Sequence, residues 1–149
     1  MSREFRHIVR VLGTDLDGTK KVACALTSIK GVGIRMANAI VEKAGINPDE
    51  RLGFLTEGEI ERLEAVAKDP VGHGIATWLL NRRKDRTTGQ DLHLFGSDLD
   101  LQVKADIDLM KAIKSWKGYR HAYGLKVRGQ RTRTTGRTGK TVGVRRKRR

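Results

Sequence analysis

The side chains of this sequence best suited to chemistry are cations, and they gather at one end of the chain. Of its 31 Lys and Arg residues, 15 follow Asp108, and no Asp or Glu follows that position. The other 16 cations face all 17 acidic residues, so residues 1–108 sum to −1 although the whole chain carries +14. Such one-sided asymmetry is typical of a polyanion-binding protein. The chemistry it favours is the binding of phosphate groups.

The last part of the chain, residues 118–149, predicts an extended basic arm. After Val127 the only aliphatic residues are Val142 and Val144, too few to offset the entropy of ordering a backbone. We expect this arm to be disordered when alone in water, and residues 128–149 could then reach roughly 75 Å. Arg and Thr side chains on a thin backbone can reach phosphate oxygens in several directions. The candidate RNA-binding residues of the arm are Arg120, His121, Arg128, Arg131, Arg133, Arg137 and Lys140. A solvated basic tail or a localisation signal is the alternative.

Aromatic residues precede the arm and are interleaved with its first cations. Trp116, Tyr119 and Tyr123 surround Arg120 and His121. Aromatic rings can stack on unpaired bases while cations hold phosphates, which suits RNA loops better than a regular duplex. The alternative is that Trp116 and Tyr123 are core residues that close the preceding helix.

A pair of glycines between two predicted helices forms a second candidate phosphate site. The first helix is expected over Lys20–Thr27, and apolar spacing predicts the second over Ile34–Ala44 with Gly45 as its C-terminal cap. Glycines let a backbone approach a phosphate, whose charge the free N–H groups of a helix N-terminus can meet. This resembles the helix-hairpin-helix (helix-two-turns-helix) modules of nucleic-acid-binding proteins, although a tight turn between helices explains it too. The candidate RNA-binding residues here are Lys30, Gly31, Gly33 and Arg35.

A third candidate site follows an apolar anchor. The anchor consists of Ile75, Trp78, Leu79 and Leu80. It delivers the candidate RNA-binding residues Arg82, Arg83 and Lys84, with Arg86 completing the cluster. A solvated loop is the alternative. The polar residues 87–96 predict a loop, hairpin-like around Thr88-Gly89.

Three further elements position these sites. Phe5–Leu12 is predicted to be a strand or extended segment, and Gly13–Gly18 a tight loop. Thr56 and Glu59 predict a capping box for a helix that ends before Asp69-Pro70, with an acidic face directed at solvent or a protein partner. A further helix is expected from Ser97 or Asp98 to about Ser115. The acidic face consists of Glu57, Glu61 and Glu64.

Several classes of function are disfavoured. The single cysteine, Cys24, is expected to be a small buried hydrophobe, and the four His residues lack metal-ligand spacing, so neither a metal nor a cofactor is predicted. No catalytic constellation has a supporting context, so we expect no enzyme. No apolar run approaches the ~18 residues of a membrane span. We therefore expect a soluble intracellular protein without a membrane partner.

A known family matches these motifs. The run Lys117-Gly118-x-Arg120-His121-x-x-Gly124-Leu125-x-Val127-Arg128-Gly129-Gln130-Arg131-Thr132 resembles the signature of small-subunit ribosomal protein thirteen, called eighteen in eukaryotes. Residues 134–144, and the pattern Trp78-x-Leu80-Asn81-Arg82, resemble the archaeal and eukaryotic branch. Bacterial members usually have Pro where this chain has Lys126.

The resemblance implies a structural constituent of the small (30S) ribosomal subunit, on the ribosome in the cytoplasm. It implies binding to the 3′ domain of 16S rRNA in the subunit head, beside small-subunit protein nineteen. It further implies a bridge to large-subunit protein five and a tail that approaches the peptidyl-site tRNA. The residues expected at that tRNA are Arg145, Arg146, Lys147, Arg148 and Arg149. The alternative is a free-standing helix-hairpin-helix protein of repair or chromatin.

The expected fold is mainly α, with a small helical domain, a long helix and the arm. We predict an N-terminal helical domain over residues 1–70, a basic insertion and long helix over residues 71–117, and the arm over residues 118–149.

Overall fold

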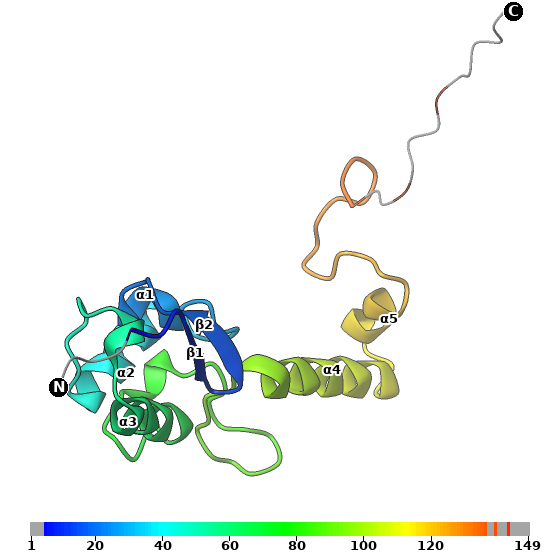
Figure 1. Cartoon of the computed structure of the whole chain (residues 1–149). Coiled ribbons are helices and arrows are strands. Elements are labelled where there is room, and N and C mark those ends of the chain that lie inside the picture. The colour runs from blue at the N-terminus through cyan, green and yellow to red at the C-terminus, as the bar shows by residue number, and fades with distance from the viewer. Residues whose placement is uncertain (1–4, 137–138, 140–142, 144–149) are drawn as a thin grey trace, which may run out of the picture. The chain divides into compact units, whose positions relative to one another are not determined.

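The computed structural model of the protein describes residues 5–136, 139 and 143. These residues are mainly helical with a small two-stranded sheet (Figure 1), which confirms the predicted fold class. The chain forms two compact units, residues 1–101 and residues 102–149. The three-part division by function stays a prediction. The elements are β1 (Ile8–Val11), β2 (Thr14–Asp17), α1 (Val22–Leu26), α2 (Ile34–Ala44), η1 (Leu52–Phe54), α3 (Glu57–Lys68), η2 (Thr77–Leu79), α4 (Gly96–Ala112) and α5 (Trp116–Ala122), where η denotes a 3-10 helix.

The core of the first unit lies between α1, α2, α3 and the inner face of the hairpin. Helix α2 buries residues at helical spacing, as the sequence predicts. Gly45 ends this helix in the left-handed conformation (φ 68°), and the N–H of Ile46 donates to the carbonyl of Val41 at 3.1 Å. The largest fully buried side chains are Leu16, Leu26, Ile29, Ile40, Leu52 and Leu63.

The segment expected to be a tight loop is in part a strand. Thr14–Asp17 pairs antiparallel with β1, with Ile8 opposite Asp17. The alternation along β2 directs Leu16 into the core, where it is 2% exposed. The actual turn is only Leu12-Gly13, with φ of 50° and 74°, as short hairpin turns require. Asp and Gly favour turns, so their presence in this segment led to the prediction of a loop in place of an alternating strand.

The capping box of α3 is confirmed, but the acidic face of this helix is not wholly free. The hydroxyl of Thr56 accepts from the N–H of Glu59, whose carboxylate accepts from the N–H of Thr56. Glu64 Oε1 accepts from the N–H of Leu12 at 2.9 Å, which ties the hairpin turn to α3. Glu64 is therefore a structural residue rather than part of a partner surface.

The helix expected to run to about Ser115 ends at Ala112, and α5 follows after a sharp corner. Lys114 takes a left-handed conformation (φ 57°), and the N–H of Ser115 donates to the carbonyl of Met110 at 3.2 Å. Ser115 Oγ then accepts from the N–H of Gly118 at 3.1 Å and caps α5. A Cβ atom on Gly118 would lie 2.1 Å from the carbonyl oxygen of Met110, so only glycine fits this corner.

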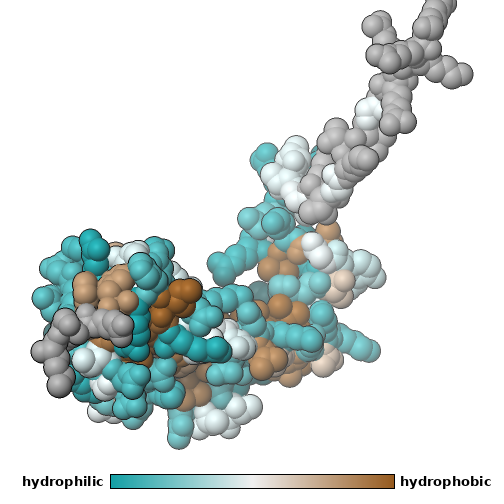
Figure 2. Space-filling model, in the orientation of Figure 1, coloured by the Kyte–Doolittle hydropathy of each residue, from teal (hydrophilic) through white to brown (hydrophobic). Residues whose placement is uncertain are grey.

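The apolar residues of α4 recur at helical spacing, which suggests a buried face, but this face is not buried. No residue of this helix is buried, and Leu101 and Val103 are 66% and 48% exposed. Figure 2 shows apolar side chains at the surface of this part of the chain.

Candidate nucleic-acid interface

Gly31, the first glycine of the predicted phosphate site, is committed to packing within the protein. It has a φ of 96°, and a Cβ atom there would lie 2.6 Å from the carbonyl oxygen of Leu94. The N–H of Gly96 donates to the carbonyl of Lys30 at 2.9 Å, which holds the same two segments together. The close backbone approach that Gly31 allows is therefore an approach to the protein's own chain.

Gly33 and Arg35, in contrast, remain open to a ligand. Gly33 is exposed at the N-terminus of α2, with a φ of −92°, and no atom lies within 4 Å of a Cβ built there. No side chain caps this helix, so its first N–H groups can face an anion. Arg35 is exposed beside them, whereas Lys30 Nζ forms an ion pair with Asp100. Whether these residues contact RNA stays a prediction.

Replacing Gly31 by Ala is expected to lower the free energy of unfolding by about 1–3 kcal/mol, because it forces a side chain into a left-handed conformation and against a carbonyl. Gly33→Ala is the matched control, and should cost less than about 1 kcal/mol since only a weak cap preference is removed. Urea unfolding measures both. Equal losses of stability in the two variants would contradict the packing role of Gly31.

His93 fixes the neighbouring loop to the glycine hairpin. Its side chain is buried, its Nδ1 accepts from the N–H of Asn81 at 3.3 Å, and its Nε2 donates to the carbonyl of Gly31 at 3.1 Å. This arrangement suits the neutral imidazole, which donates with one nitrogen and accepts with the other. Burial lowers the pKa of His93 from its ordinary value, and the hydrogen bond to Gly31 opposes this only in part.

We expect stability to fall as pH drops below the ordinary pKa of histidine, 6.5, towards the lowered pKa of folded His93. In that window the unfolded chain binds a proton that the folded chain does not, so the free energy of unfolding rises with pH. His93→Gln should flatten this part of the curve, whereas the exposed His73→Gln should not. The measurement is urea unfolding between pH 5 and 7.5. An unchanged pH slope in His93→Gln would contradict this role.

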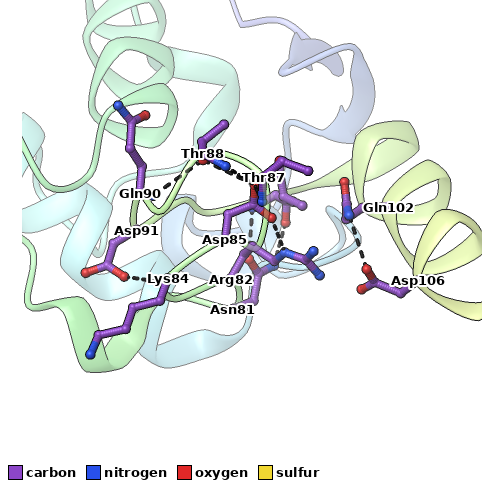
Figure 3. A network of polar contacts seen from close by, with 11 residues as sticks. Asn81, Arg82, Lys84, Asp85, Thr87, Thr88, Gln90, Asp91, Gln102 and Asp106 are labelled. Atoms are coloured by element: carbon purple, nitrogen blue, oxygen red, sulfur yellow. Dashed lines mark hydrogen bonds and ion pairs between the residues drawn. The ribbon is translucent and has the colours of Figure 1, made fainter. Parts of the chain in front are cut away.

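The carboxylate of Asp85 makes most of the contacts that organise the basic cluster after Leu80 (Figure 3), and Asp91 Oδ1 accepts from the N–H of Lys84 at 2.7 Å. Asp85 accepts from Arg82 Nε at 2.9 Å, from Thr87 Oγ1 at 2.5 Å and from both the N–H and the hydroxyl of Thr88 at 3.2 Å. The hydroxyl of Thr87 and the guanidinium of Arg82 hold the pKa of Asp85 far below its usual range. The side chain of Arg82 is 19% exposed, so its charge is neutralised within the loop.

The loop that these contacts hold is hairpin-like, as predicted. Arg82 pairs with Leu92 in an isolated bridge, and Gly89 turns the chain at a φ of 71°. The side chains of Arg83 and Lys84 line a pocket with Thr77 and Asp91. Of the three predicted contacts, Arg83 and Lys84 can therefore reach a phosphate without breaking a structural ion pair.

The anchor of this loop is smaller than the sequence suggests. Ile75 and Leu80 are buried, at 4% and 6% exposed, but Trp78 is 70% exposed on η2. Trp78 therefore does not serve as a core residue.

Helix α5 carries the aromatic residues on its surface. The rings of Trp116 and Tyr119 are stacked, with centroids 5.8 Å apart and planes within 8°, and Tyr123 lies 4.6 Å beyond Tyr119. Trp116 is 70% exposed and Tyr123 66%, so the alternative that they are core residues is wrong. The guanidinium of Arg120 lies 5.9 Å from the centre of the Trp116 ring.

The residues that follow α5 explain part of the signature motif in physical terms. Gly124 is left-handed (φ 66°), and its N–H donates to His121 while the N–H of Leu125 donates to Arg120. This pair of bonds is the Schellman motif that ends many helices. Arg120 Nε donates to the carbonyl of Lys126 at 2.5 Å and draws the chain back along the helix.

Beyond this turn, the described part of the arm contains no helix or strand (Figure 1). Arg128, Arg131 and Arg133 are exposed there. The remaining predicted contacts, Arg137, Lys140 and residues 145–149, lie outside the described residues. Disorder of the free arm stays a prediction.

The described part of the chain has no candidate metal site and no membrane-spanning helix. No group of three His, Cys, Asp or Glu residues within it could hold a metal ion, and none of its helices is long and apolar enough to cross a membrane. Cys24 is exposed, contrary to expectation, because α1 buries the residues on both sides of it instead.

Sequence reasoning missed two residues that position the candidate contacts, Asp85 and His93. Asp85 could have been found, since an Asp followed two and three residues later by Thr is typical of a turn that the carboxylate closes. No local signal marks His93, because its carbonyl partner lies 62 residues away.

Comparison with known proteins gives a consistent result. The family model described as "Ribosomal protein S13/S18" matches residues 10–138. The chain is 55% identical to "Small ribosomal subunit protein uS13" of Staphylothermus marinus, over 99% of this chain and 98% of that protein. Proteins of the same description from Pyrobaculum aerophilum and Saccharolobus solfataricus are 57% and 52% identical, each over 99% of this chain and over 96% and 89% of their own lengths.

Proposed function

Since the chain belongs to the ribosomal protein S13/S18 family, we propose that it is a constituent of the small ribosomal subunit that binds the 3′ domain of 16S rRNA in the subunit head. A member of this family has a structural ribosomal role and is not an enzyme, as the sequence predicts. The observation that carries the proposal is the placement of cations. After Asp108 the chain has 15 Lys and Arg and no acidic residue, and those that the structure describes are largely exposed.

The predicted rRNA-binding residues differ in how accessible they are to RNA. The best supported rRNA contacts are Arg35 with the N-terminus of α2, Arg83 with Lys84, and the described cations from Arg120 to Arg133, because their side chains or backbone groups face solvent. Lys30 and Arg82 are each paired with a carboxylate, Asp100 and Asp85, so a phosphate there competes with an acidic side chain. Gly31 packs against Leu94, and a backbone contact between Gly31 and RNA stays a prediction.

The finer placement rests on the family resemblance. From this resemblance we propose that the protein lies on the ribosome in the cytoplasm, beside small-subunit protein nineteen, and forms a bridge to large-subunit protein five. We also propose that the basic end, residues 145–149, approaches the peptidyl-site tRNA.

The free-standing helix-hairpin-helix alternative loses support. Gly31, one of the two glycines of its hairpin, packs against Leu94 of the protein itself. The chain also matches ribosomal proteins over nearly its whole length.

Co-sedimentation tests the proposal. A tagged chain expressed in archaeal cells should sediment with small subunits and remain there after a high-salt wash, because an integral component is held by many contacts at once. Release by the wash, together with preferential binding to duplex DNA, would overturn the proposal and favour the free-standing alternative.

A further inference from the structure

The three rings of Trp116, Tyr119 and Tyr123 form a continuous surface, which we call the aromatic ladder. Their spacing of three and four residues places them on one face of α5. The centroid distances of 5.8 Å and 4.6 Å are those of interacting rings. All three are at least half exposed, at 70%, 52% and 66%.

The helix that carries the ladder is fixed at both ends. Ser115 caps its first turn and the Schellman motif at Gly124 ends it. Gly118 is buried against the carbonyl of Met110, so the helix cannot rotate about its axis without a clash. A surface held in this way loses little conformational entropy when a ligand binds.

The charges near the ladder indicate which ligand this is. Its cationic neighbours in sequence are Lys111, Lys114, Lys117, Arg120, Lys126 and Arg128, and no acidic residue follows Asp108. A protein partner that covered the rings would also have to bring acidic side chains to meet these cations. Unpaired nucleotides present flat bases and a phosphate at every step, and thus match rings and cations together.

We propose that the aromatic ladder is a stacking platform for unpaired rRNA bases, with Trp116 and Tyr123 as the two rings against which bases stack. This rests on the proposed function, since it assigns the kind of RNA that this part of the chain takes. Trp116 and Tyr123 are 70% and 66% exposed, so each ring has surface left for a base. The guanidinium of Arg120, 5.9 Å from the centre of the Trp116 ring, lies close enough to meet the phosphate of a base bound there. The ladder therefore distinguishes single-stranded from double-stranded RNA.

Two ten-unit RNAs test the proposal on the full-length chain: an oligoadenylate and an abasic strand with the same backbone. In a Trp78→Phe background Trp116 is the sole tryptophan of the chain. Oligoadenylate should quench its fluorescence and bind roughly five- to 160-fold more tightly than the abasic strand, the range expected for one stacked base. The abasic strand should not quench it.

Substitutions test whether the preference for oligoadenylate comes from the aromatic ladder. Trp116→Leu and Tyr123→Leu should each reduce the preference for oligoadenylate, measured with labelled RNA, while Trp116→Phe should retain most of it. Trp78→Leu is the matched control, because Trp78 is also 70% exposed but lies on η2. Equal affinity for the two strands, or an unchanged preference in both Leu variants, would overturn the ladder and leave the proposed function standing. Failure to bind either RNA at low salt would overturn both.

Discussion

Raising the salt concentration from 50 to 200 mM is expected to weaken binding of this protein to small-subunit rRNA by roughly 10³- to 10⁵-fold. The reason is the release of counterions, which makes affinity fall with each phosphate that a cation neutralises. Six to ten such contacts give this range, and 15 cations follow Asp108. Filter binding to the isolated 3′ domain of 16S rRNA at several salt concentrations measures the slope. A flat response would mean that phosphate contacts do not hold the complex.

Variants assign this slope to the arm. Replacing the exposed Arg128, Arg131 and Arg133 by Ala should reduce the logarithmic salt slope by about 0.7–0.9 for each phosphate that is no longer neutralised. The matched control replaces three exposed lysines outside the arm, Lys20, Lys43 and Lys104. The control should leave the slope nearly unchanged, and an equal reduction in both sets would show that charge alone, irrespective of its position, holds the RNA.

Local signals in the sequence predicted local structure well. The capping box at Thr56 and Glu59, and the left-handed cap at Gly45, each depend on atoms within four residues. The Thr88-Gly89 turn was found for the same reason. Helix caps and tight turns of this kind need no tertiary contact, so they can be predicted from the local sequence.

Contacts between distant segments could not be predicted. Leu12 and Glu64 are 52 residues apart, and a Cβ on Gly31 would clash with Leu94. A glycine pair looks the same whether the approaching backbone is that of RNA or of the protein itself, and only the fold decides between them. For this reason the sequence pointed to RNA at Gly31 and missed its packing against Leu94, while an RNA contact there stays a prediction.

The exposure of the aromatic residues could not be predicted from the sequence either. Helical spacing predicts that Trp116, Tyr119 and Tyr123 share a face, but it does not say whether another element covers that face. The corner at Lys114 and Ser115 ends α4 early and starts a separate helix. If α4 had continued without this corner, its apolar stripe would have run on into the three rings.

The two ends of the arm are expected to serve different RNAs. Residues 120–137 mix Arg, Gly and Thr next to aromatic rings, a composition suited to fixed positions within folded rRNA, whereas residues 144–149 are nearly pure charge. Pure charge binds a phosphate backbone without reading it. A chain end that meets every tRNA in the peptidyl site can use contacts of this kind only.

Deleting residues 145–149 is therefore expected to leave incorporation into small subunits nearly intact while weakening tRNA retention in the peptidyl site. The weakening should be largest at low salt, because attraction between exposed charges is screened within ~10 Å at 0.1 M salt. Changing Arg120, Arg128 and Arg131 together to Ala should instead reduce incorporation first. Since Arg120 also holds the turn after α5 through Lys126, the double variant Arg128→Ala with Arg131→Ala separates loss of charge from loss of local structure. Sucrose-gradient sedimentation measures incorporation, and filter binding of peptidyl-site tRNA measures retention. If the five-residue deletion blocked incorporation while the double and triple variants did not, this division of the arm would be wrong.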